Sequence, residues 1–300
     1  MDRRAMGSCM LYIETFSFER RRVNGTEIAF RTAGSGPPLL LLHGFPQTNV
    51  MWHKIAPALA ESFTIIAADL RGYGDSAVPE SGPDHAAYAK RAMANDMVGL
   101  MDSLGHDSFM VAGHDRGGRV AHRMARDHAD RVNRLAVLDI APTAAMYGQT
   151  DMRFATAYYH WFYLIQPAPL PERMIGADAE FYLRSKCGQW GRTSGAITDA
   201  AFADYLRCFS QTDRIHAMCE DYRAAATIDL EHDEEDGSAK LQMPLLALWG
   251  EAGFVGNNYD VLAEWRQVAS DVSGHGVPGG HYLPEEAPEE TLSALRGFFG

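Results

Sequence analysis

Short, continuous apolar runs recur along the chain, and stretches with helical periodicity separate them. Four of the runs have the length of strands that are covered on both faces of a sheet. They are residues 39–43, 63–69, 109–114 and 135–139. Helical patterns lie between them, near residues 51–61, 90–104 and 118–128. This alternation predicts right-handed βαβ units, and therefore an α/β fold with a mostly parallel sheet flanked by helices.

The pattern changes near the N-terminus and again after the middle of the chain. Residues 11–33 predict two strands around a turn at Asn24 and Gly25. Residues 144–240 are rich in aromatic residues, Arg and Met at helical spacing, and show no clear strand pattern. A strand pattern returns at residues 244–249, and a last helix is predicted at 288–299. We therefore expect a core α/β domain formed by residues 1–143 and 240–300, with a helical cap domain inserted at residues 144–239.

The predicted strand at residues 109–114 leads into a glycine-rich turn and then into a helix. The turn has the pattern G-x-D-x-G, from Gly113 to Gly117, with Asp115 at its centre. A strand–turn–helix of this form is typical of a nucleophile elbow, which usually carries Ser. A serine must be deprotonated and typically attacks acyl carbon, whereas an aspartate is already ionised at neutral pH. Asp115 can therefore displace a leaving group from saturated carbon and form an ester. The pattern alone is weak, because it also occurs in ordinary turns.

Two further residues complete a catalytic set. Asp139 ends a predicted strand, and ligands of open α/β sheets bind beyond such strand ends. His281 lies in a late loop, PGGHYLPEEAP, so the chain order is nucleophile, acid and histidine. Hydrolysis of an ester on Asp115 needs a base: His281 can accept the proton from water, and Asp139 can hold the histidine tautomer. Glu251, which follows the strand at residues 244–249, remains the alternative acid.

The run HGFP, residues 43–46, directly follows the leucines of the first buried strand. A loop at this place offers a backbone N–H to an oxyanion hole, and the N–H of Arg116, after the nucleophile, is the second donor. With an aspartate nucleophile the hole would hold the second carboxylate oxygen and then the tetrahedral intermediate of ester hydrolysis. Phe45 of this loop is a candidate substrate-binding residue.

Composition and charge limit the classes of function that this chain can have. The 300 residues are 46% hydrophobic, enough for one large core. The formal net charge is −12 without a block of Lys or Arg, which argues against nucleic-acid binding and requires any anion site to be local.

We expect no membrane span and no signal peptide. The cysteines show no metal-ligand spacing and are expected to be free thiols in a reducing cytoplasm. They are Cys9, Cys187, Cys208 and Cys219.

The full sequence resembles the α/β-hydrolase superfamily, and the segment GHDRGGRVAHRMARDH is similar to fluoroacetate (haloacetate) dehalogenases. In that family two arginines bind the substrate carboxylate, one directly after the nucleophile and one three residues later. Arg116 and Arg119 match both places. Three residues span about one helical turn, so both guanidinium groups can face one anion. The alternative is that Arg119 is a surface residue of the helix.

The resemblance also implies a halide site in the cap, formed by His160, Trp161 and Tyr222. Imidazole and indole N–H groups and a phenol O–H can replace the hydration of a departing fluoride. The alternative is an aromatic-rich cap that only packs its own core. Trp190 matches a cap tryptophan near the substrate. The resemblance implies conversion of a haloacetate to glycolate and halide through an aspartyl ester, by a homodimer without a metal or an organic cofactor.

Three other interpretations remain. Epoxide hydrolases share the aspartate nucleophile but usually supply two cap tyrosines; Tyr222 is one candidate, while His160 stands at the other place beside Tyr158 and Tyr159. Paired arginines have no role for a neutral epoxide, or for the neutral substrate of a haloalkane dehalogenase. A non-catalytic receptor on the same fold is disfavoured by the complete catalytic set. The pattern leaves open which halogen is preferred.

Overall fold

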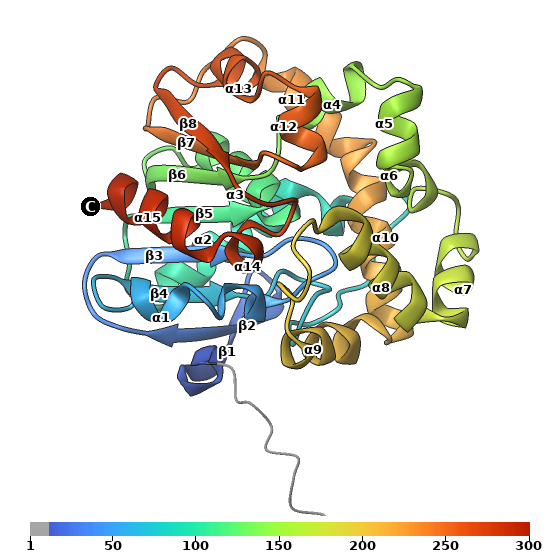
Figure 1. Ribbon diagram of the computed structural model, residues 1–300, viewed down its shortest axis with the longest axis horizontal. Helices are drawn as coiled ribbons and strands as arrows, with labels where there is room; N and C mark the ends of the chain where they lie inside the picture. The colour runs from blue at the N-terminus through green and yellow to red at the C-terminus, as the bar shows by residue number, and fades with distance from the viewer. Residues whose placement is uncertain (1–11) are drawn as a thin grey trace, which may run out of the picture.

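The computed structural model describes residues 12–300 and contains one eight-stranded sheet (Figure 1). The strand order is β1-β2-β4-β3-β5-β6-β7-β8; β2 pairs antiparallel with β1 and β4, and the other pairs are parallel. The predicted α/β class with a mostly parallel sheet is confirmed. The strands are β1 (Ser17–Val23), β2 (Thr26–Ala33), β3 (Pro38–Leu42), β4 (Thr64–Ala68), β5 (Phe109–His114), β6 (Val132–Leu138), β7 (Leu245–Gly250) and β8 (Val272–Val277).

Helices cover both faces of this sheet. On one face α1 (Ala56–Leu59) packs against α15 (Pro288–Phe299); on the other, α2 (Lys90–Ser103) packs against α3 (Arg116–Asp127). Each central strand is therefore shielded from water on both sides, and Leu39, Leu40, Leu41 and Leu42 are all fully buried. The parallel strands end at one common edge, where the loops that follow them come together.

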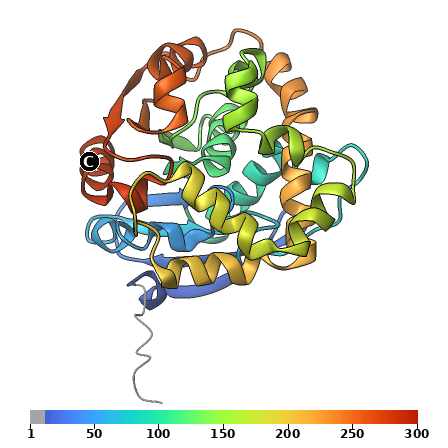
Figure 2. The ribbon, with the colours of Figure 1, turned by 45° about the vertical axis from the view of Figure 1, so that its right-hand side comes forward.

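Eight helices without an intervening strand follow β6. They are α4 (Thr143–Gly148), α5 (Met152–Ala157), α6 (His160–Tyr163), α7 (Leu170–Ala177), α8 (Ala179–Trp190), α9 (Asp199–Phe209), α10 (Thr212–Ala225) and α11 (Ile228–Asp236). We call α4–α11 the inserted helices. They lie together on one side of the molecule, beyond the sheet (Figures 1 and 2). The division into a core and a cap domain at residues 143 and 239 stays a prediction.

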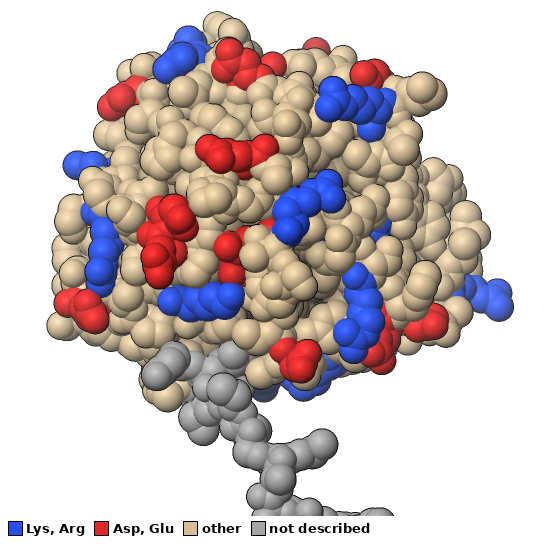
Figure 3. Space-filling model, viewed as in Figure 1, with Lys and Arg blue, Asp and Glu red and all other residues tan. Residues whose placement is uncertain are grey.

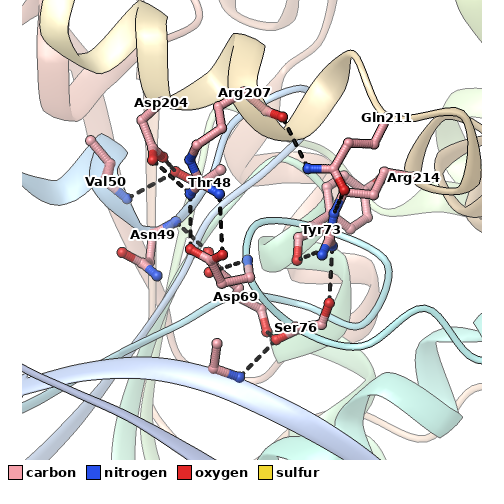
Figure 4. Close-up of polar contacts among 12 residues, drawn as sticks. Thr48, Asn49, Val50, Asp69, Tyr73, Ser76, Asp204, Arg207, Gln211 and Arg214 are labelled. Atoms are coloured by element: carbon pink, nitrogen blue, oxygen red, sulfur yellow. Dashed lines mark hydrogen bonds and ion pairs between the residues drawn. The ribbon is translucent and has the colours of Figure 1, made fainter.

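The inserted helices are tied to the sheet through the loop that follows β4 (Figure 4). Arg207 of α9 donates to Asp75 of this loop at 2.8 and 3.1 Å, and to Asp204 at 2.9 Å. Arg214 of α10 donates to the backbone oxygens of Tyr73 and Ser76 at 3.2 and 2.9 Å. These contacts fix the position of two inserted helices above the strand ends.

One local prediction differs from the structure, and one strand was not predicted. The helix expected at residues 51–61 is divided into a 3-10 turn, η2 (Asn49–Trp52), and the short α1. Pro57 stands at the start of α1, where its missing N–H prevents a continuous helix. Strand β8 has no apolar run in the sequence, because it is an edge strand of mostly exposed and glycine positions.

The remaining elements are short or lie near the C-terminus. They are η1 (Tyr12–Thr15), η3 (Ala86–Tyr88), α12 (Phe254–Asn258), α13 (Val261–Val268) and α14 (Leu283–Glu286). Within residues 12–300 no helix combines the length and apolarity needed to cross a membrane. Cys187, Cys208 and Cys219 are free thiols. Cys9 and the segment considered for a signal peptide lie outside the described residues.

Candidate active site

Asp115 stands at the sharp turn between β5 and α3. Its backbone angles are φ 46° and ψ −115°, a strained conformation for a residue with a side chain. The turn is possible because its neighbours are glycines: a Cβ on Gly117 would lie 2.3 Å from the backbone oxygen of His43, and one on Gly113 would lie 2.4 Å from that of Gly117. The two glycines of the G-x-D-x-G pattern therefore permit the close packing that presents Asp115 at the strand edge.

The loop after β3 supplies a donor to this carboxylate. The backbone N–H of Phe45 donates to Asp115 Oδ1 at 2.9 Å. Arg116 is the first residue of α3, so its own N–H has no partner inside the helix. Burial raises the pKa of Asp115, but the positive charges of His281, Arg116 and Arg119 outweigh it and leave the pKa below the usual value. Asp115 is therefore ionised at neutral pH.

His281 connects Asp115 to a second carboxylate. His281 Nδ1 donates to Asp139 Oδ2 at 2.6 Å, and Nε2 lies 3.9 Å from Asp115 Oδ2. The other oxygen of Asp139 accepts the N–H of Gly250 at 3.0 Å, which fixes the carboxylate. Burial lowers the pKa of His281, but its hydrogen bond to Asp139 and the charges of Asp139 and Asp115 outweigh this and raise it. Glu251, the alternative acid, is exposed and makes no ion pair with His281. The carboxylate that contacts His281 is therefore that of Asp139.

Arg116 is held in a buried ion pair that the sequence analysis did not anticipate. Its Nε and Nη2 donate to the carboxylate of Asp221 on α10 at 2.9 and 2.7 Å, and its guanidinium lies 4.2 Å from the ring centroid of Tyr222. Lys90 also binds Asp221, and lies 3.3 Å from Asp229. The positive charges of Arg116 and Lys90 are thus balanced by Asp221 and Asp229.

Arg119 is buried but has no such partner. Its Nη1 donates to the oxygen of Ala141 at 3.1 Å and to Thr143 Oγ1 at 2.9 Å, and its guanidinium lies 4.8 Å from the ring centroid of Trp161. No carboxylate among residues 12–300 forms an ion pair with it. Burial and the charge of Arg116 lower its pKa, and the charge of nearby Asp115 offsets this only in part. A buried cation without a counter-ion is costly, so this position favours an anionic ligand. The alternative of Arg119 as a surface residue is wrong, because its side chain is buried.

Aromatic side chains from the inserted helices surround the loop after β3. His160 stacks on Phe45 at 6.1 Å between ring centroids, and contacts Tyr222 at 5.4 Å and Trp190 at 4.5 Å. Trp190 in turn lies 5.6 Å from the ring of His281. Burial lowers the pKa of His160, so its ring is neutral. The structure therefore brings these predicted residues into one cluster with the predicted catalytic set, while Trp161 contacts the cluster through Arg119.

The cluster contains buried nitrogen and oxygen atoms that have no hydrogen-bond partner within the protein. They are Arg116 Nη1, Arg119 Nε, His160 Nδ1, Trp190 Nε1 and the hydroxyl oxygen of Tyr222. Arginine, indole and phenol groups are hydrogen-bond donors, and a neutral imidazole offers one donor. Because buried donors are usually paired, this concentration next to Asp115 indicates a binding site for an acceptor-rich or anionic ligand.

A cleft of about 550 Å³ borders this cluster at His281 and Trp190. Its lining includes the buried residue Tyr158 and the exposed residues Arg153 and Arg192, and exposure places the two arginines at its mouth. Within the described residues no group of three or more His, Cys, Asp or Glu side chains is arranged to hold a metal ion.

Sequence reasoning missed two residues of this arrangement, Asp221 and Lys90. Asp221 directly precedes the predicted residue Tyr222. An acidic residue in a helical stretch rich in aromatic residues is the sequence feature that could have indicated a buried ion pair. Arg116 and Asp221 are separated by 105 positions, so their pairing depends on how the inserted helices fold back.

Comparisons with known proteins agree with the fold. The family described as alpha/beta hydrolase fold matches residues 37–288. The chain belongs to the α/β-hydrolase family. A fluoroacetate dehalogenase from Burkholderia sp is 44% identical to this hydrolase, over 94% of the chain and 93% of the relative. A soluble epoxide hydrolase from Corynebacterium sp. (strain C12) is 36% identical, over 92% and 95% of the two chains.

A solved α/β-hydrolase structure from Nostoc sp PCC 7120 is 58% identical, with a TM-score of 0.95, and covers 96% of this chain and 99% of its own. The fold and family expected from the sequence are therefore confirmed: this α/β hydrolase shares its family with a fluoroacetate dehalogenase.

Proposed function

We propose that this hydrolase cleaves the carbon–halogen bond of haloacetates and releases glycolate and halide. The observation that carries the proposal is the buried, unpaired cation Arg119 beside an ionised Asp115, within a cluster of unpartnered donors. An anionic substrate supplies the missing counter-charge of Arg119. The carboxylate of Asp115 supplies a nucleophile for saturated carbon.

In the first step Arg119 and the free Nη1 of Arg116 hold the substrate carboxylate. Asp115 Oδ1 stays bound to the Phe45 N–H, and Oδ2 attacks the 2-carbon of the haloacetate. The new carbon–oxygen bond forms as the carbon–halogen bond breaks, and the halide leaves with the bonding electron pair. The product of this step is an ester of Asp115.

The halide departs toward the inserted helices. His160 and Tyr222 have buried polar atoms without partners there, and we assign halide contacts to both. Trp161, which packs on Arg119, is included as a third contact because of the resemblance to haloacetate dehalogenases. Fluoride is strongly hydrated in water, so its departure depends on donors that replace that hydration. Trp190 and Phe45 form the wall against which the substrate packs.

In the second step water hydrolyses the ester. His281 Nε2 accepts a proton from water, and the hydroxide attacks the carboxyl carbon of Asp115. The N–H groups of Phe45 and Arg116 stabilise the oxyanion of the tetrahedral intermediate. The bond to the glycolate oxygen then breaks, His281 returns its proton to that oxygen, and Asp115 loses a proton and is ionised again. Asp139 stabilises the imidazolium while it exists.

The 44% identity to a fluoroacetate dehalogenase supports the proposal. The second candidate is hydrolysis of an epoxide, favoured by the 36% identity to a soluble epoxide hydrolase and by the unpartnered hydroxyl of Tyr222. Both reactions use the ester on Asp115. The charge of Arg119 favours the haloacid, because a neutral epoxide leaves this buried guanidinium without an ion-pair partner.

A parallel assay with fluoroacetate, chloroacetate and styrene oxide separates the candidates. We expect halide release from at least one haloacid and no diol from styrene oxide. Diol formation without halide release from either haloacid would replace the proposal by the epoxide reaction. Homodimer formation and a cytoplasmic location stay predictions, which light scattering of the purified protein and cell fractionation test.

A further inference from the structure

Glu286, the last residue of α14, lies outside the predicted catalytic set but contacts the backbone on both sides of His281. Its Oε2 accepts the N–H of Gly280 at 2.9 Å, and its Oε1 accepts the N–H of Tyr282 at 2.8 Å. Glu286 is buried, with an exposed fraction of 9%. Hydrogen bonds from backbone amides to a buried carboxylate are charge-assisted and stronger than those between neutral groups. One carboxylate thus fixes both neighbours of the histidine.

The same carboxylate binds the loop between α8 and α9. Its Oε2 also accepts the N–H of Arg192 at 2.6 Å and that of Thr193 at 3.0 Å. This loop runs beside α14 in both ribbon views (Figures 1 and 2). Glu286 therefore joins the loop that carries His281 to the loop that follows Trp190. The N–H of His281 donates to the Trp190 oxygen at 3.1 Å and closes the same junction.

The two loops approach each other so closely that only glycine fits at the contact points. A Cβ on Gly280 would lie 2.4 Å from the backbone oxygen of Trp190 and 2.9 Å from the Arg192 nitrogen. A Cβ on Gly279 would lie 3.1 Å from the Cβ of Glu286. The loop between β8 and α14 is therefore held between the inserted helices and α14.

We infer that Glu286 is a positioning residue that holds the backbone of His281 so that Nε2 points at the ester on Asp115. The inference rests on the proposed function, because it assigns Glu286 to the second half of that reaction. Attack by Asp115 on the substrate does not need a base, whereas hydrolysis of the ester does. Loss of the Glu286 contacts therefore slows ester hydrolysis much more than halide release. A shift of about 1 Å in a catalytic group costs as much as about 100-fold in rate.

The test compares E286Q with the wild-type enzyme in a single turnover with chloroacetate and enzyme in excess. The amide keeps the size of the side chain, but its NH₂ group meets an N–H donor where a carboxylate oxygen accepted. We expect halide release within about twofold of wild type and ester hydrolysis at least about tenfold slower. Intact mass spectrometry then shows an alkylated enzyme that accumulates in the variant but not in the wild type.

A matched control is E289Q. Glu289 lies three residues later in the first turn of α15, is exposed, and takes no part in the hydrogen bonds that join the two loops. We expect E289Q to hydrolyse the ester at the wild-type rate. Circular dichroism melting of both variants shows whether E286Q is folded under the assay conditions; E286D, which keeps the charge on a shorter side chain, replaces it if E286Q is unfolded.

Equal slowing of halide release and ester hydrolysis, or no slowing of either, would overturn the inference. Failure of the proposed function has a different signature, because the wild-type enzyme then releases no halide. In that case the single turnover is repeated with styrene oxide in place of chloroacetate. Alkylated enzyme that accumulates in E286Q while diol forms more slowly than in wild type supports the role of Glu286, and an unchanged ratio of alkylated enzyme to diol overturns it.

Discussion

At the scale of single residues, the unpaired charge of Arg119 distinguishes this site from that of an enzyme for neutral substrates. Arg116 and Arg119 match the family pattern equally well in the sequence, but their surroundings differ. Arg116 shares Asp221 with Lys90, and Arg119 has only neutral partners, Thr143 among them. We therefore expect most of the electrostatic attraction for the carboxylate of the proposed substrate to come from Arg119.

The substitution R119M tests this assignment. It keeps much of the packing volume and removes the charge, so we expect kcat/KM for chloroacetate to fall by about 100-fold or more, chiefly through KM. R184M, which changes an exposed arginine of α8, is the matched control and should leave kcat/KM unchanged. Steady-state kinetics of the two variants give the comparison. Equal kcat/KM in R119M and R184M would show that Arg119 does not bind the substrate.

The raised pKa of His281 gives a second prediction. The hydrogen bond and charge of Asp139 raise this pKa above 6.5, so the imidazole of the free enzyme stays charged below that pH and becomes a free base only as the pH rises through the raised value. In D139N the buried ring loses both contributions, so its pKa should fall. NMR titration of the His281 ring in both proteins measures the change. An unchanged pKa in D139N would contradict the pairing of His281 with Asp139.

Asp115, His281 and Asp139 could be found from the sequence because glycines and strand ends mark their places. Glu286 could not, because its carboxylate binds backbone N–H groups, and backbone groups leave no signal in a sequence pattern. Asp221 was missed for another reason: its contact with Arg116 joins α10 to α3 across 105 positions.

At the scale of elements, the pattern of burial decides which strands could be predicted from the sequence. The strands were predictable because their residues are buried on both faces and therefore uniformly apolar. Strand β8 was not, because an edge strand keeps polar and glycine positions. The inserted helices were predicted as a group, but the individual ends of α5 and α6 depend on aromatic packing that a sequence does not specify.

The turn between β5 and α3 depends on close backbone contacts at its glycines, and this gives a prediction about stability. In G117A the new methyl group would lie 2.3 Å from the His43 oxygen, so the elbow must shift; we expect a loss of about 1–3 kcal/mol in unfolding free energy and a large loss of activity. G188A in α8 is the control, since nothing lies within 4 Å of the added Cβ. This helix substitution should be neutral or stabilise by up to about 1 kcal/mol. Urea unfolding of both variants measures the difference, and equal stability would contradict the packing of the elbow.

At the scale of the whole molecule, the net charge of −12 opposes the approach of an anionic substrate. Acidic and basic side chains are interspersed on the face that Figure 3 shows. Arg153 and Arg192 at the mouth of the cleft are exposed and form no ion pair with any carboxylate in the described part of the chain. The mouth is therefore locally more positive than the overall charge suggests.

The double variant R153Q/R192Q tests this local attraction. We expect kcat/KM for chloroacetate to fall by about three- to tenfold at low salt, with kcat unchanged. The difference from wild type should shrink as the ionic strength rises, because salt screens exposed charges. Initial rates over a salt series measure the effect. A double variant that follows the wild-type salt dependence would remove any role for the two arginines in substrate capture.

The most direct test of the central claim is a single turnover of the wild-type enzyme in ¹⁸O-labelled water, with enzyme in excess over the haloacetate. In the proposed mechanism water attacks the carboxyl carbon of Asp115, so the label should enter Asp115, and the glycolate of the first turnover should carry unlabelled oxygen. Mass spectrometry of the peptide that contains Asp115 and of the glycolate measures both. Label in the first glycolate and none in Asp115 would show direct attack of water on the substrate and contradict the covalent mechanism.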